Sequence, residues 1–488
     1  MFPLESLIAI DKKLSLPVYK QIVHAIVNAI RGGMLKAGAH LPGSRELAGK
    51  LGVHRKTVIA AYEELNAQDW IMIVPRKRVS VSARIPLLKP QKWNARHRVP
   101  SFDNDLALPF RVIAPTKGTD AGRVPEIIID DGHPDVRLSP VDELLKTYRS
   151  YTSRKYTIKT ALIGTEQGTI QLREELVRYL SETRGLNVSV ENILITHGAQ
   201  MGIYLAAQLL LNADTCVIAG KPGYPVAGRT FEETGAKLTE VPVDEYGMDT
   251  DAVERLCKKQ PVAAVYAIPH HHYPTTVTLS VERRMKLLEL SQQYSFAIIE
   301  DDYDYDYHYS SSPFLPLASG RHNGNVIYIG SFSKILDPSL RIGFMVAPRN
   351  FIDQCRALRA IIDVGGDGYM QNALAALIKG GELKRHLKKA KKIYHQRRDL
   401  LDKLLKEELG NYLSYVLPSG GMAVWITLLP AYPVERLQAI PRLKILGANG
   451  QQNAFRFGFA SMNETELTAA VYLLKETLKG IEQNRVKK

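Results

Sequence analysis

The sequence is poor in cysteine: 488 residues contain only Cys216, Cys257 and Cys355, which are widely spaced. An odd number of distant cysteines gives no sign of a disulfide framework, so we expect a reduced protein of the cytoplasm. Long apolar runs are also missing, and no stretch of about 18 apolar residues predicts a membrane span. Residues 1–5 do not begin a charged segment followed by an apolar one, so we expect no signal peptide.

Acidic residues are scarce at the N-terminal end. The net charge is +14, and residues 1–82 contain 12 Lys and Arg against 6 Asp and Glu. Residues 83–125 contain 8 against 3, whereas the remaining 363 residues together carry only +3. Positive charge gathered at one end of a chain indicates a polyanionic partner for that end, and nucleic acid is the natural candidate.

Hydrophobic periodicity divides the chain into three regions. Residues 1–82 predict short helices followed by two strands. Residues 83–125 contain six prolines among scattered basic residues, which predicts an extended linker between domains. From residue 126 to 488, helical segments alternate with short apolar strands, which predicts an α/β domain with a mostly parallel sheet covered on both faces.

Two short predicted helices near residues 44–51 and 55–65 are joined by a turn at Gly52, a pattern typical of a helix-turn-helix. Ser44 is expected to cap the first helix, and two strands around a basic tip predict a wing. Arginine suits this role because its planar fork binds guanine edges and phosphates. The residues expected to contact DNA are Ser44, Arg45, Arg55, Lys56, Thr57, Arg76, Lys77 and Arg78.

This region resembles the GntR-type winged helix over about residues 15–82. The resemblance depends on Leu41-Pro42-x-Ser44-Arg45-x-Leu47-Ala48 and Thr57-Val58-x-x-Ala61-Tyr62. It implies binding to a double-stranded DNA operator. His54 stands where serine is frequent, and the wing tip lacks the usual glycines. A helical protein-interaction domain is the alternative reading.

The segment from Ser331 to Arg341 is the strongest chemical signal. Lys334 is flanked by Ser331 and Ser333, with Arg341 seven positions on. Such a lysine can form a Schiff base with an aldehyde cofactor, while the hydroxyls and the arginine hold the phosphate of that cofactor. Pyridoxal 5'-phosphate (PLP) is such a cofactor. A lone Ser-x-Ser-Lys is a weak signal, so the prediction depends on the residues that accompany it.

An acidic run follows the apolar strand predicted at residues 296–299. A carboxylate at the carboxyl end of a parallel strand lies where ligands bind, so Asp301 could pair with a protonated pyridine nitrogen. Tyr303 could bond the phenolate oxygen of the same ring. The density of aspartate at positions 301, 302, 304 and 306 leaves a metal site or a solvated loop as alternatives.

Three further segments supply candidate groups. Residues 198–200 join a strand to a helix, whose N-terminus favours a phosphate, although an ordinary turn would look the same. Tyr224 can stack on a cofactor ring. Arg456 lies in an apolar strand and needs a partner, either an incoming carboxylate or a structural ion pair.

Together these segments resemble the fold type I PLP-dependent aminotransferases over about residues 130–480. The resemblance implies Lys334 as the Schiff-base lysine, Asp301 at the pyridine nitrogen, Tyr303 at the phenolate oxygen and Tyr224 on the ring. It places Gly198, Ala199, Gln200, Ser331, Ser333 and Arg341 around the phosphate, and Arg456 at an effector carboxylate.

One segment departs from the aminotransferase pattern. Aminotransferases carry an Asn-Pro-Thr-Gly turn, but Tyr273 and Thr276 take the places of its Asn and Gly, which argues against efficient transamination. This turn is preceded by His270, His271 and His272, so a zinc site is an alternative interpretation. Adjacent side chains point in different directions, so we expect no shared metal.

A winged helix, a basic linker and an aminotransferase-like domain in one chain resemble the MocR family of regulators. Residues 270–275 and 300–304 echo segments of that family. The resemblance implies a homodimeric, PLP-dependent transcription regulator that senses an amine, an amino acid or PLP, and that is not a physiological enzyme. Two alternatives remain: an active aminotransferase carrying a DNA-binding module, and a repressor that has lost the cofactor.

Overall fold

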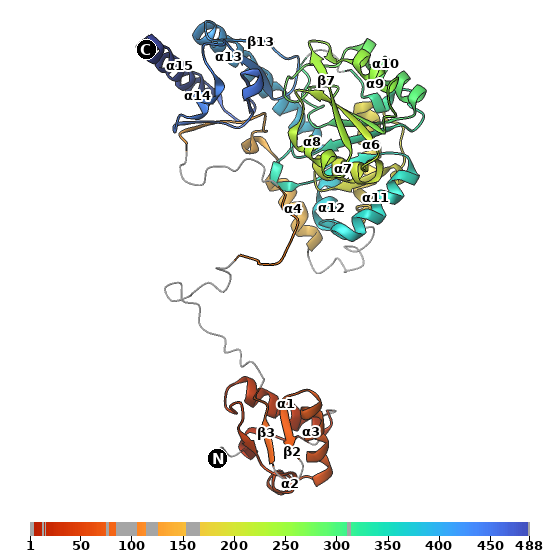
Figure 1. Ribbon diagram of the computed structural model, residues 1–488, viewed down its shortest axis with the longest axis vertical. Helices are drawn as coiled ribbons and strands as arrows, with labels where there is room; N and C mark the ends of the chain where they lie inside the picture. The colour runs from red at the N-terminus through yellow and green to blue at the C-terminus, as the bar shows by residue number, and fades with distance from the viewer. Residues whose placement is uncertain are drawn as a thin grey trace. The chain divides into compact units, whose positions relative to one another are not determined.

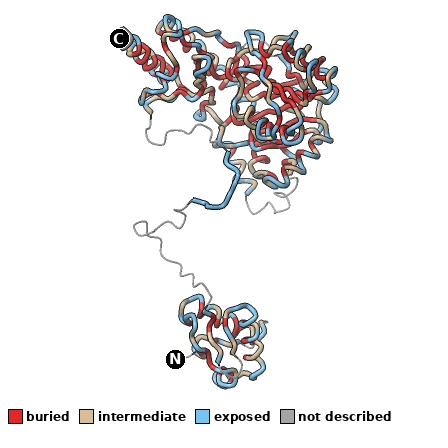
Figure 2. The backbone as a smooth tube through the Cα atoms, in the orientation of Figure 1, coloured by how far each residue is buried: buried red, intermediate tan, exposed pale blue. Residues whose placement is uncertain are grey.

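The computed structural model describes residues 4–11, 14, 16–74, 78–83, 105–113, 125–152, 166–309 and 314–486. The chain forms two compact units, residues 1–118 and 119–488 (Figure 1). Of the predicted linker at 83–125, only residues 83, 105–113 and 125 are described; residues 105–113 are exposed and form no helix or strand (Figure 2). Within the described residues, no helix combines the length and apolar character that a bilayer crossing needs.

The N-terminal unit packs helices against a small antiparallel sheet of order β1-β3-β2. Apolar residues at helical spacing, such as Ile22, Ile26 and Ile30, are fully buried against Leu47 and Val58. Its elements are η1 (Leu4–Leu7), α1 (Val18–Arg31), β1 (His40–Leu41), α2 (Ser44–Leu51), α3 (Arg55–Ala67), β2 (Ile71–Val74) and β3 (Arg78–Val81).

The capping of the two short helices differs from the prediction. Gly43 is the N-cap of α2, and Ser44 is already the first helical residue without a capping bond, so the prediction that Ser44 caps this helix is wrong. α2 ends at Gly52, which has the left-handed conformation. His54 caps α3, because its Nδ1 accepts a hydrogen bond of 3.2 Å from the backbone N–H of Lys56. An imidazole thus serves as the N-cap, a position at which serine is more usual.

The large unit is built on a sheet of order β5-β12-β11-β10-β9-β6-β7-β8. The pairs among β11, β10, β9, β6 and β7 are parallel, whereas β12 and β8 run antiparallel to their neighbours. The sheet is therefore mixed but mostly parallel, which confirms the predicted fold. Its strands are β5 (Ile193–Thr196), β6 (Cys216–Lys221), β7 (Lys237–Asp244), β8 (Gly247–Met248), β9 (Ala264–Ala267), β10 (Ala297–Asp302), β11 (Val326–Ser331) and β12 (Gly343–Val346).

Helices cover both faces of this sheet, as the apolar strands predict. These elements are η2 (Val136–Leu138), α4 (Val141–Thr152), α6 (Ile170–Arg184), η3 (Val190–Asn192), α7 (Ala199–Leu210), α8 (Pro225–Glu232), α9 (Thr250–Cys257), α10 (Val281–Tyr294), η4 (Leu317–Ser319), η5 (Pro338–Leu340), α11 (Arg349–Ile362) and α12 (Gly368–Lys379). Because side chains alternate along a strand, Ile299 joins the core with α7, α8 and α11, and Ile298 joins the opposite core with α9 and α10. Figure 2 shows the strands as the buried centre of this unit.

The end of the chain forms a second, smaller sheet of order β13-β14-β17-β16. Its elements are α13 (Glu382–Leu409), β13 (Leu413–Tyr415), β14 (Ala423–Leu428), α14 (Val434–Gln438), β15 (Leu443–Ile445), β16 (Ala448–Asn449), η6 (Gly450–Gln452), β17 (Ala454–Gly458) and α15 (Glu464–Val486). β15 pairs in parallel with β4 (Ile127–Ile129), so residues just after β4 are held beside the C-terminal sheet. This pairing carries Asp130–His133 to the site described next.

Candidate cofactor site

A cavity of about 270 Å³ lies where β6, β9, β10 and β11 end and α7 begins. This is the edge of a parallel sheet at which ligands bind. The cavity brings together predicted residues from four separate segments of the chain. They are Ala199, Gln200, Tyr224, Asp301, Tyr303, Ser331, Ser333, Lys334 and Arg341.

Lys334 follows β11 and points its amine at the segment after β4. Its Nζ donates a 2.7 Å hydrogen bond to the carbonyl oxygen of Gly132. Burial lowers the pKa of Lys334 below its ordinary value, and the neighbouring Asp131 opposes this only in part. A lowered pKa increases the neutral fraction of the amine, which is the form that attacks a carbonyl.

Asp301 lies within β10, because this strand runs three residues beyond its predicted end at residue 299. The hydroxyl of Tyr266 donates to its Oδ2 at 2.6 Å, while its Oδ1 is buried without a hydrogen-bond partner. Burial raises the pKa of Asp301 to about 7, although the Tyr266 bond acts in the opposite direction. An orphan buried acceptor on a cavity wall suits a ring nitrogen that carries a proton.

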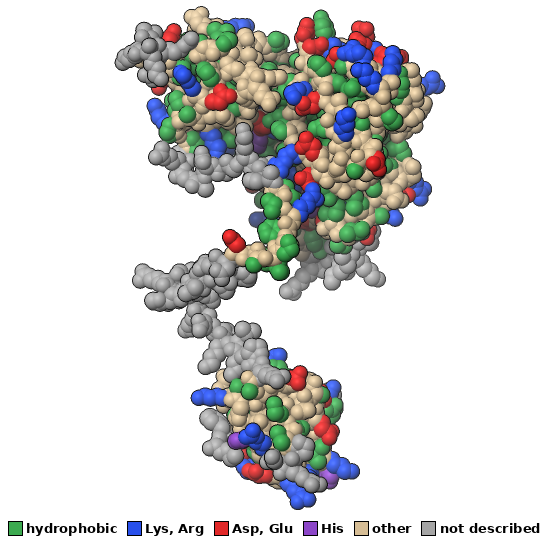
Figure 3. Space-filling model, viewed as in Figure 1, with side chains coloured by type: hydrophobic (Ala, Val, Ile, Leu, Met, Phe, Trp, Pro, Cys, Tyr) green, Lys and Arg blue, Asp and Glu red, His purple; other side chains and the backbone are tan. Residues whose placement is uncertain are grey.

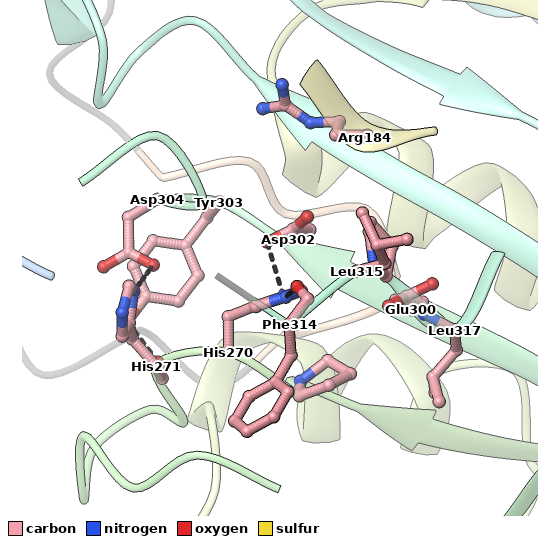
Figure 4. A network of polar contacts seen from close by, with 12 residues as sticks. Arg184, His270, His271, Glu300, Asp302, Tyr303, Asp304, Phe314, Leu315 and Leu317 are labelled. Carbon is pink, nitrogen blue, oxygen red and sulfur yellow. Dashed lines mark hydrogen bonds and ion pairs between the residues drawn. The ribbon is translucent and has the colours of Figure 1, made fainter. Parts of the chain in front are cut away.

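Strand alternation sends the two neighbours of Asp301 to the opposite face of the sheet. The two carboxylate oxygens of Glu300 accept from the backbone N–H groups of Leu317 and Ala318 at 2.7 and 2.9 Å. Asp302 accepts from the Tyr328 hydroxyl at 2.6 Å. Figure 4 shows Glu300 and Asp302 in this separate polar network. The acidic run is therefore divided between a cavity and a buried structural network.

The three consecutive histidines share no partner among these contacts. His270 lies 2.6 Å from the carbonyl oxygen of Phe314, and its Nδ1 lies 3.3 Å from Asp302. His271 pairs with Asp304 at 2.8 Å, as Figure 4 shows. His272 contacts the Thr275 hydroxyl at 2.9 Å. Among the described residues, no group of three or more His, Cys, Asp or Glu side chains could hold a metal ion.

The N-terminus of α7 and Arg341 form one end of the cavity. Gly198 is the N-cap of α7 with φ +77°, and a Cβ there would lie 2.8 Å from Nη2 of Arg341. Arg341 donates to the carbonyl oxygen of His197 at 3.1 Å. The Ser333 hydroxyl is buried without a hydrogen-bond partner. Helix N–H groups, a hydroxyl and a guanidinium that converge in this way suit a phosphate.

Tyr303 and Tyr224 also line the cavity. The hydroxyl of Tyr303 donates to the carbonyl oxygen of His271 at 2.8 Å. Tyr224 meets Tyr273 edge to face, with ring centroids 5.4 Å apart. Burial raises the pKa of Tyr224 to about 12, so it is a neutral ring at physiological pH.

Arg456, in β17, contacts two residues that line the cavity, Tyr273 and Tyr303. It is 1% exposed and is not among the residues that line the cavity. Its Nε and Nη1 donate to the carbonyl oxygens of Asp131 and Pro274 at 2.8 and 3.0 Å, and it stacks on the Tyr273 ring at 4.9 Å. Its Nη2 lies 3.5 Å from the hydroxyl of Tyr303, which lines the cavity. That Arg456 receives a substrate or effector carboxylate stays a prediction.

The cavity is also lined by Asp131 and His133, which were not predicted as site residues, and by Tyr273, which takes the place of the aminotransferase Asn. A usable signal was present, because Asp130 and Asp131 follow the apolar strand Ile127–Ile129 just as Asp301 follows its own apolar run. Tyr266, which orients Asp301, could not be predicted as a site residue because it lies within an apolar strand.

The cavity residues fit PLP: a buried amine of lowered pKa, an orphan carboxylate oxygen, two tyrosine rings and a phosphate-sized donor cluster face one space. Comparison with known proteins gives the family. Residues 139–474 match the model described as aminotransferase class I and II.

The chain belongs to the aminotransferase class I and II family. PLP as the cofactor is confirmed at the level of this family. A kynurenine aminotransferase from Pyrococcus horikoshii, solved in complex with PMP, is 27% identical and superimposes with a TM-score of 0.67, covering 73% of this chain and 91% of that one.

This aminotransferase domain is joined to a second family module. Residues 18–81 match the model of bacterial regulatory proteins, gntR family. The HTH-type transcriptional regulator YdfD of Bacillus subtilis is 29% identical over 96% of this chain and 98% of its own length. The probable rhizopine catabolism regulatory protein MocR of Rhizobium meliloti is 27% identical over 85% of this chain and 83% of its own length. The arrangement is of the MocR type, which confirms the resemblance.

In the gntR-family module, the predicted DNA-contacting residues gather at the starts of α2 and α3. Arg45, Arg55 and Lys56 are exposed, and Nε of Arg55 donates to the Ser44 hydroxyl at 3.4 Å. Thr57 is half-buried. Arg78, at the start of β3, is exposed, whereas Arg76 and Lys77 fall outside the described residues. Figure 3 shows Lys and Arg side chains on the surface of this unit.

Proposed function

We propose that this member of the aminotransferase family is a PLP-dependent, DNA-binding transcription regulator that responds to an amine, an amino acid or PLP. The observation that carries the proposal is the position of Lys334 in a cavity with Asp301 and Tyr303, in a chain that also has a gntR-family module. The names of relatives with the same two-part arrangement point the same way.

Each of the predicted cofactor-binding residues has a role in holding the cofactor. Lys334 is the attachment point of the aldehyde, Asp301 faces the ring nitrogen, Tyr303 the phenolate oxygen and Tyr224 the ring. The phosphate is held by Gly198, Ala199, Gln200, Ser331, Ser333 and Arg341. When bound, PLP supplies an aldehyde that captures amines and a ring that withdraws electrons.

The residues of the chain prepare this chemistry. Burial keeps part of the Lys334 amine neutral, and the Gly132 carbonyl oxygen fixes its direction. The Tyr266 hydroxyl holds Asp301 so that Oδ1 is left for the ring nitrogen. The Tyr303 hydroxyl donates a hydrogen bond to the carbonyl oxygen of His271, and rotation of its O–H would direct the same donor to the phenolate oxygen of PLP.

Regulation requires that ligand binding favours one state of the large domain over another. In the proposed arrangement, the domain of residues 126–488 senses the ligand, the winged helix of residues 1–82 binds a double-stranded operator, and residues 83–125 link them. The active form is a cytoplasmic homodimer, so that two winged helices meet two half-sites on DNA.

An active aminotransferase is the competing function. Tyr273 occupies the place of the aminotransferase Asn and directs its hydroxyl to Asp131 at 3.3 Å, which favours the regulator. The experiment incubates the purified PLP-bound protein with a panel of amino acids and a keto acid, while fluorescence anisotropy follows its binding to operator DNA. We expect a spectral change of the cofactor and altered DNA binding without sustained product formation. Sustained turnover with unchanged DNA binding would contradict the proposal.

A further inference from the structure

Two contacts tie the Tyr303 hydroxyl to the turn that contains His271. The hydroxyl donates to the backbone carbonyl oxygen of His271 at 2.8 Å, and Nδ1 of the His271 side chain lies 2.8 Å from Oδ1 of Asp304. Because Asp304 follows Tyr303 directly in the chain, both contacts join the same two segments. Figure 4 shows the His271 and Asp304 side chains beside the Tyr303 ring. The carbonyl group that holds Tyr303 therefore belongs to a residue whose own side chain is fixed at Asp304.

The His271–Asp304 pair is enclosed by protein. Each of its side chains is 2% exposed. A Cβ on Gly421 would lie 3.2 Å from Oδ2 of Asp304, and one on Gly420 would overlap Nε2 of His271. These two outer atoms of the pair are buried without a hydrogen-bond partner among the described residues. The 2.8 Å contact is therefore the hydrogen bond that orients both side chains, and breaking it would leave two buried polar groups unsatisfied.

The exact position of Tyr303 matters because it has no helper at the phenolate oxygen. In the aminotransferase pattern an Asn also bonds that oxygen, but Tyr273 takes its place and directs its hydroxyl to Asp131 at 3.3 Å. Nη2 of Arg456 lies 3.5 Å from the Tyr303 hydroxyl and can only donate to it. The O–H of Tyr303 is thus free to donate to His271 or to PLP, and a hydrogen bond weakens steeply when its angle is poor.

We propose that the His271–Asp304 pair positions Tyr303 and so sets the strength of its hydrogen bond to the phenolate oxygen of PLP. This inference rests on the proposed function, which assigns Tyr303 to that oxygen. Neither His271 nor Asp304 is among the described residues that line the cavity, so both act through Tyr303 and are positioning residues. A donor at a phenolate stabilises the deprotonated form, so a weaker bond raises the pH at which the bound cofactor loses its proton.

The experiment measures the absorption of the full-length, PLP-bound protein against pH and takes the midpoint of its change. Tyr303→Phe lacks the donor and should raise the midpoint by about 1 pH unit. His271→Leu removes the contact with Asp304 and should raise it by about half as much. His271→Asn should restore the original midpoint, because its amide can donate to Asp304 from nearly the position of Nδ1. The dissociation constant of PLP is the second readout and should rise about 10-fold in Tyr303→Phe and about 3-fold in His271→Leu.

A double-mutant cycle separates positioning from a general structural effect. The Tyr303→Phe protein has no hydroxyl to position, so adding His271→Leu to it should change neither the midpoint nor the dissociation constant of PLP. A general structural effect of His271→Leu would appear in both backgrounds. If His271→Leu does not fold, His271→Leu combined with Asp304→Leu takes its place, because this double replacement leaves no buried carboxylate unpaired.

His272→Leu is the matched control. His272 is also buried, but its ring contacts the Thr275 hydroxyl at 2.9 Å, so its replacement should leave both readouts unchanged. The charged residues at and behind the cavity wall are the same in every variant, so their influence on the midpoint cancels; they are Asp131, Asp301, Lys334, Arg341 and Arg456.

The outcomes distinguish this inference from the proposed function. Equal effects of His271→Leu in both backgrounds, or no effect in the original one, would overturn the positioning role while PLP binding stands. No effect of Tyr303→Phe on either readout would refute the assignment of Tyr303 to the phenolate oxygen, and the positioning role with it. A protein that takes up no PLP would refute the proposed function itself.

Discussion

The hydroxyl of Tyr266 donates a 2.6 Å hydrogen bond to Oδ2 of Asp301. The two residues lie on adjacent parallel strands, β9 and β10, and face the same side of the sheet. The bond satisfies one carboxylate oxygen and leaves Oδ1 buried without a partner. A buried acceptor without a partner costs free energy, and a proton donor such as a ring nitrogen would satisfy it.

Asp301→Asn tests the protonation of this residue. The pKa of Asp301 is about 7 in the folded chain and 3.8 ordinarily, so between these values the folded state holds a proton that the unfolded chain has released. Its contribution to the free energy of unfolding is full below the lower value and is lost as the pH rises through about 7. Asn cannot titrate and lacks this dependence.

Urea unfolding of cofactor-free protein at about pH 5.5 and about pH 8.5 measures the effect. Relative to Asp301→Asn, the original protein should lose about 2 kcal/mol of unfolding free energy between these two pH values. Titration of other groups is common to both proteins and cancels. Parallel pH profiles would show that Asp301 does not carry the proton.

Glu300→Gln tests the buried network on the opposite face of the sheet (Figure 4). Both oxygens of Glu300 accept backbone N–H groups. Burial raises the pKa of Glu300 to about 8. Even a protonated Glu300 can accept both hydrogen bonds, because each carboxyl oxygen has a free lone pair. In Gln, the amide nitrogen that replaces one oxygen cannot accept. We expect a loss of about 1–3 kcal/mol in the free energy of unfolding. Glu289→Gln, exposed on α10, is the control and should change little; equal effects of both would contradict the role of the network.

Arg55→Ala tests the surface at the start of α3. Arg55 is exposed beside Ser44, and we expect loss of about 1–3 kcal/mol in DNA binding and a salt-dependence slope lower by about one. The measurement is anisotropy over a range of salt concentrations, on a duplex selected from a random pool. Lys50→Ala removes the same charge from the far end of α2, where Lys50 already pairs with Glu5 and Glu46, and should have a smaller effect. If Lys50→Ala costs more affinity than Arg55→Ala, the DNA-contacting surface lies elsewhere.

Local patterns in the sequence were enough for the fold and for part of the site. Apolar strands that alternate with helical segments predicted a sheet covered on both faces, as the two cores on either side of β10 show. Asp301 and Tyr303 could be predicted because they follow an apolar strand, and a parallel sheet gathers its ligands at such strand ends. Lys334 could be predicted because Ser331 and Ser333 flank it and Arg341 follows.

The failures share a physical cause, which is contact between distant segments. The carbonyl oxygens that Arg456 binds are 325 and 182 residues away, so its own strand gave no sign of them. Asp131 reaches the cavity only because β4 pairs with β15 near the end of the chain. Local periodicity carries no information about such pairings.

The most direct test of this account is to locate the bond between protein and cofactor. Borohydride reduction of the PLP-bound protein, followed by proteolysis and peptide mass mapping, identifies the residue that carries the pyridoxyl group. We predict a single modified residue, Lys334, and no modification in Lys334→Ala. A pyridoxyl group on another lysine, or covalent labelling that persists in Lys334→Ala, would contradict the central claim.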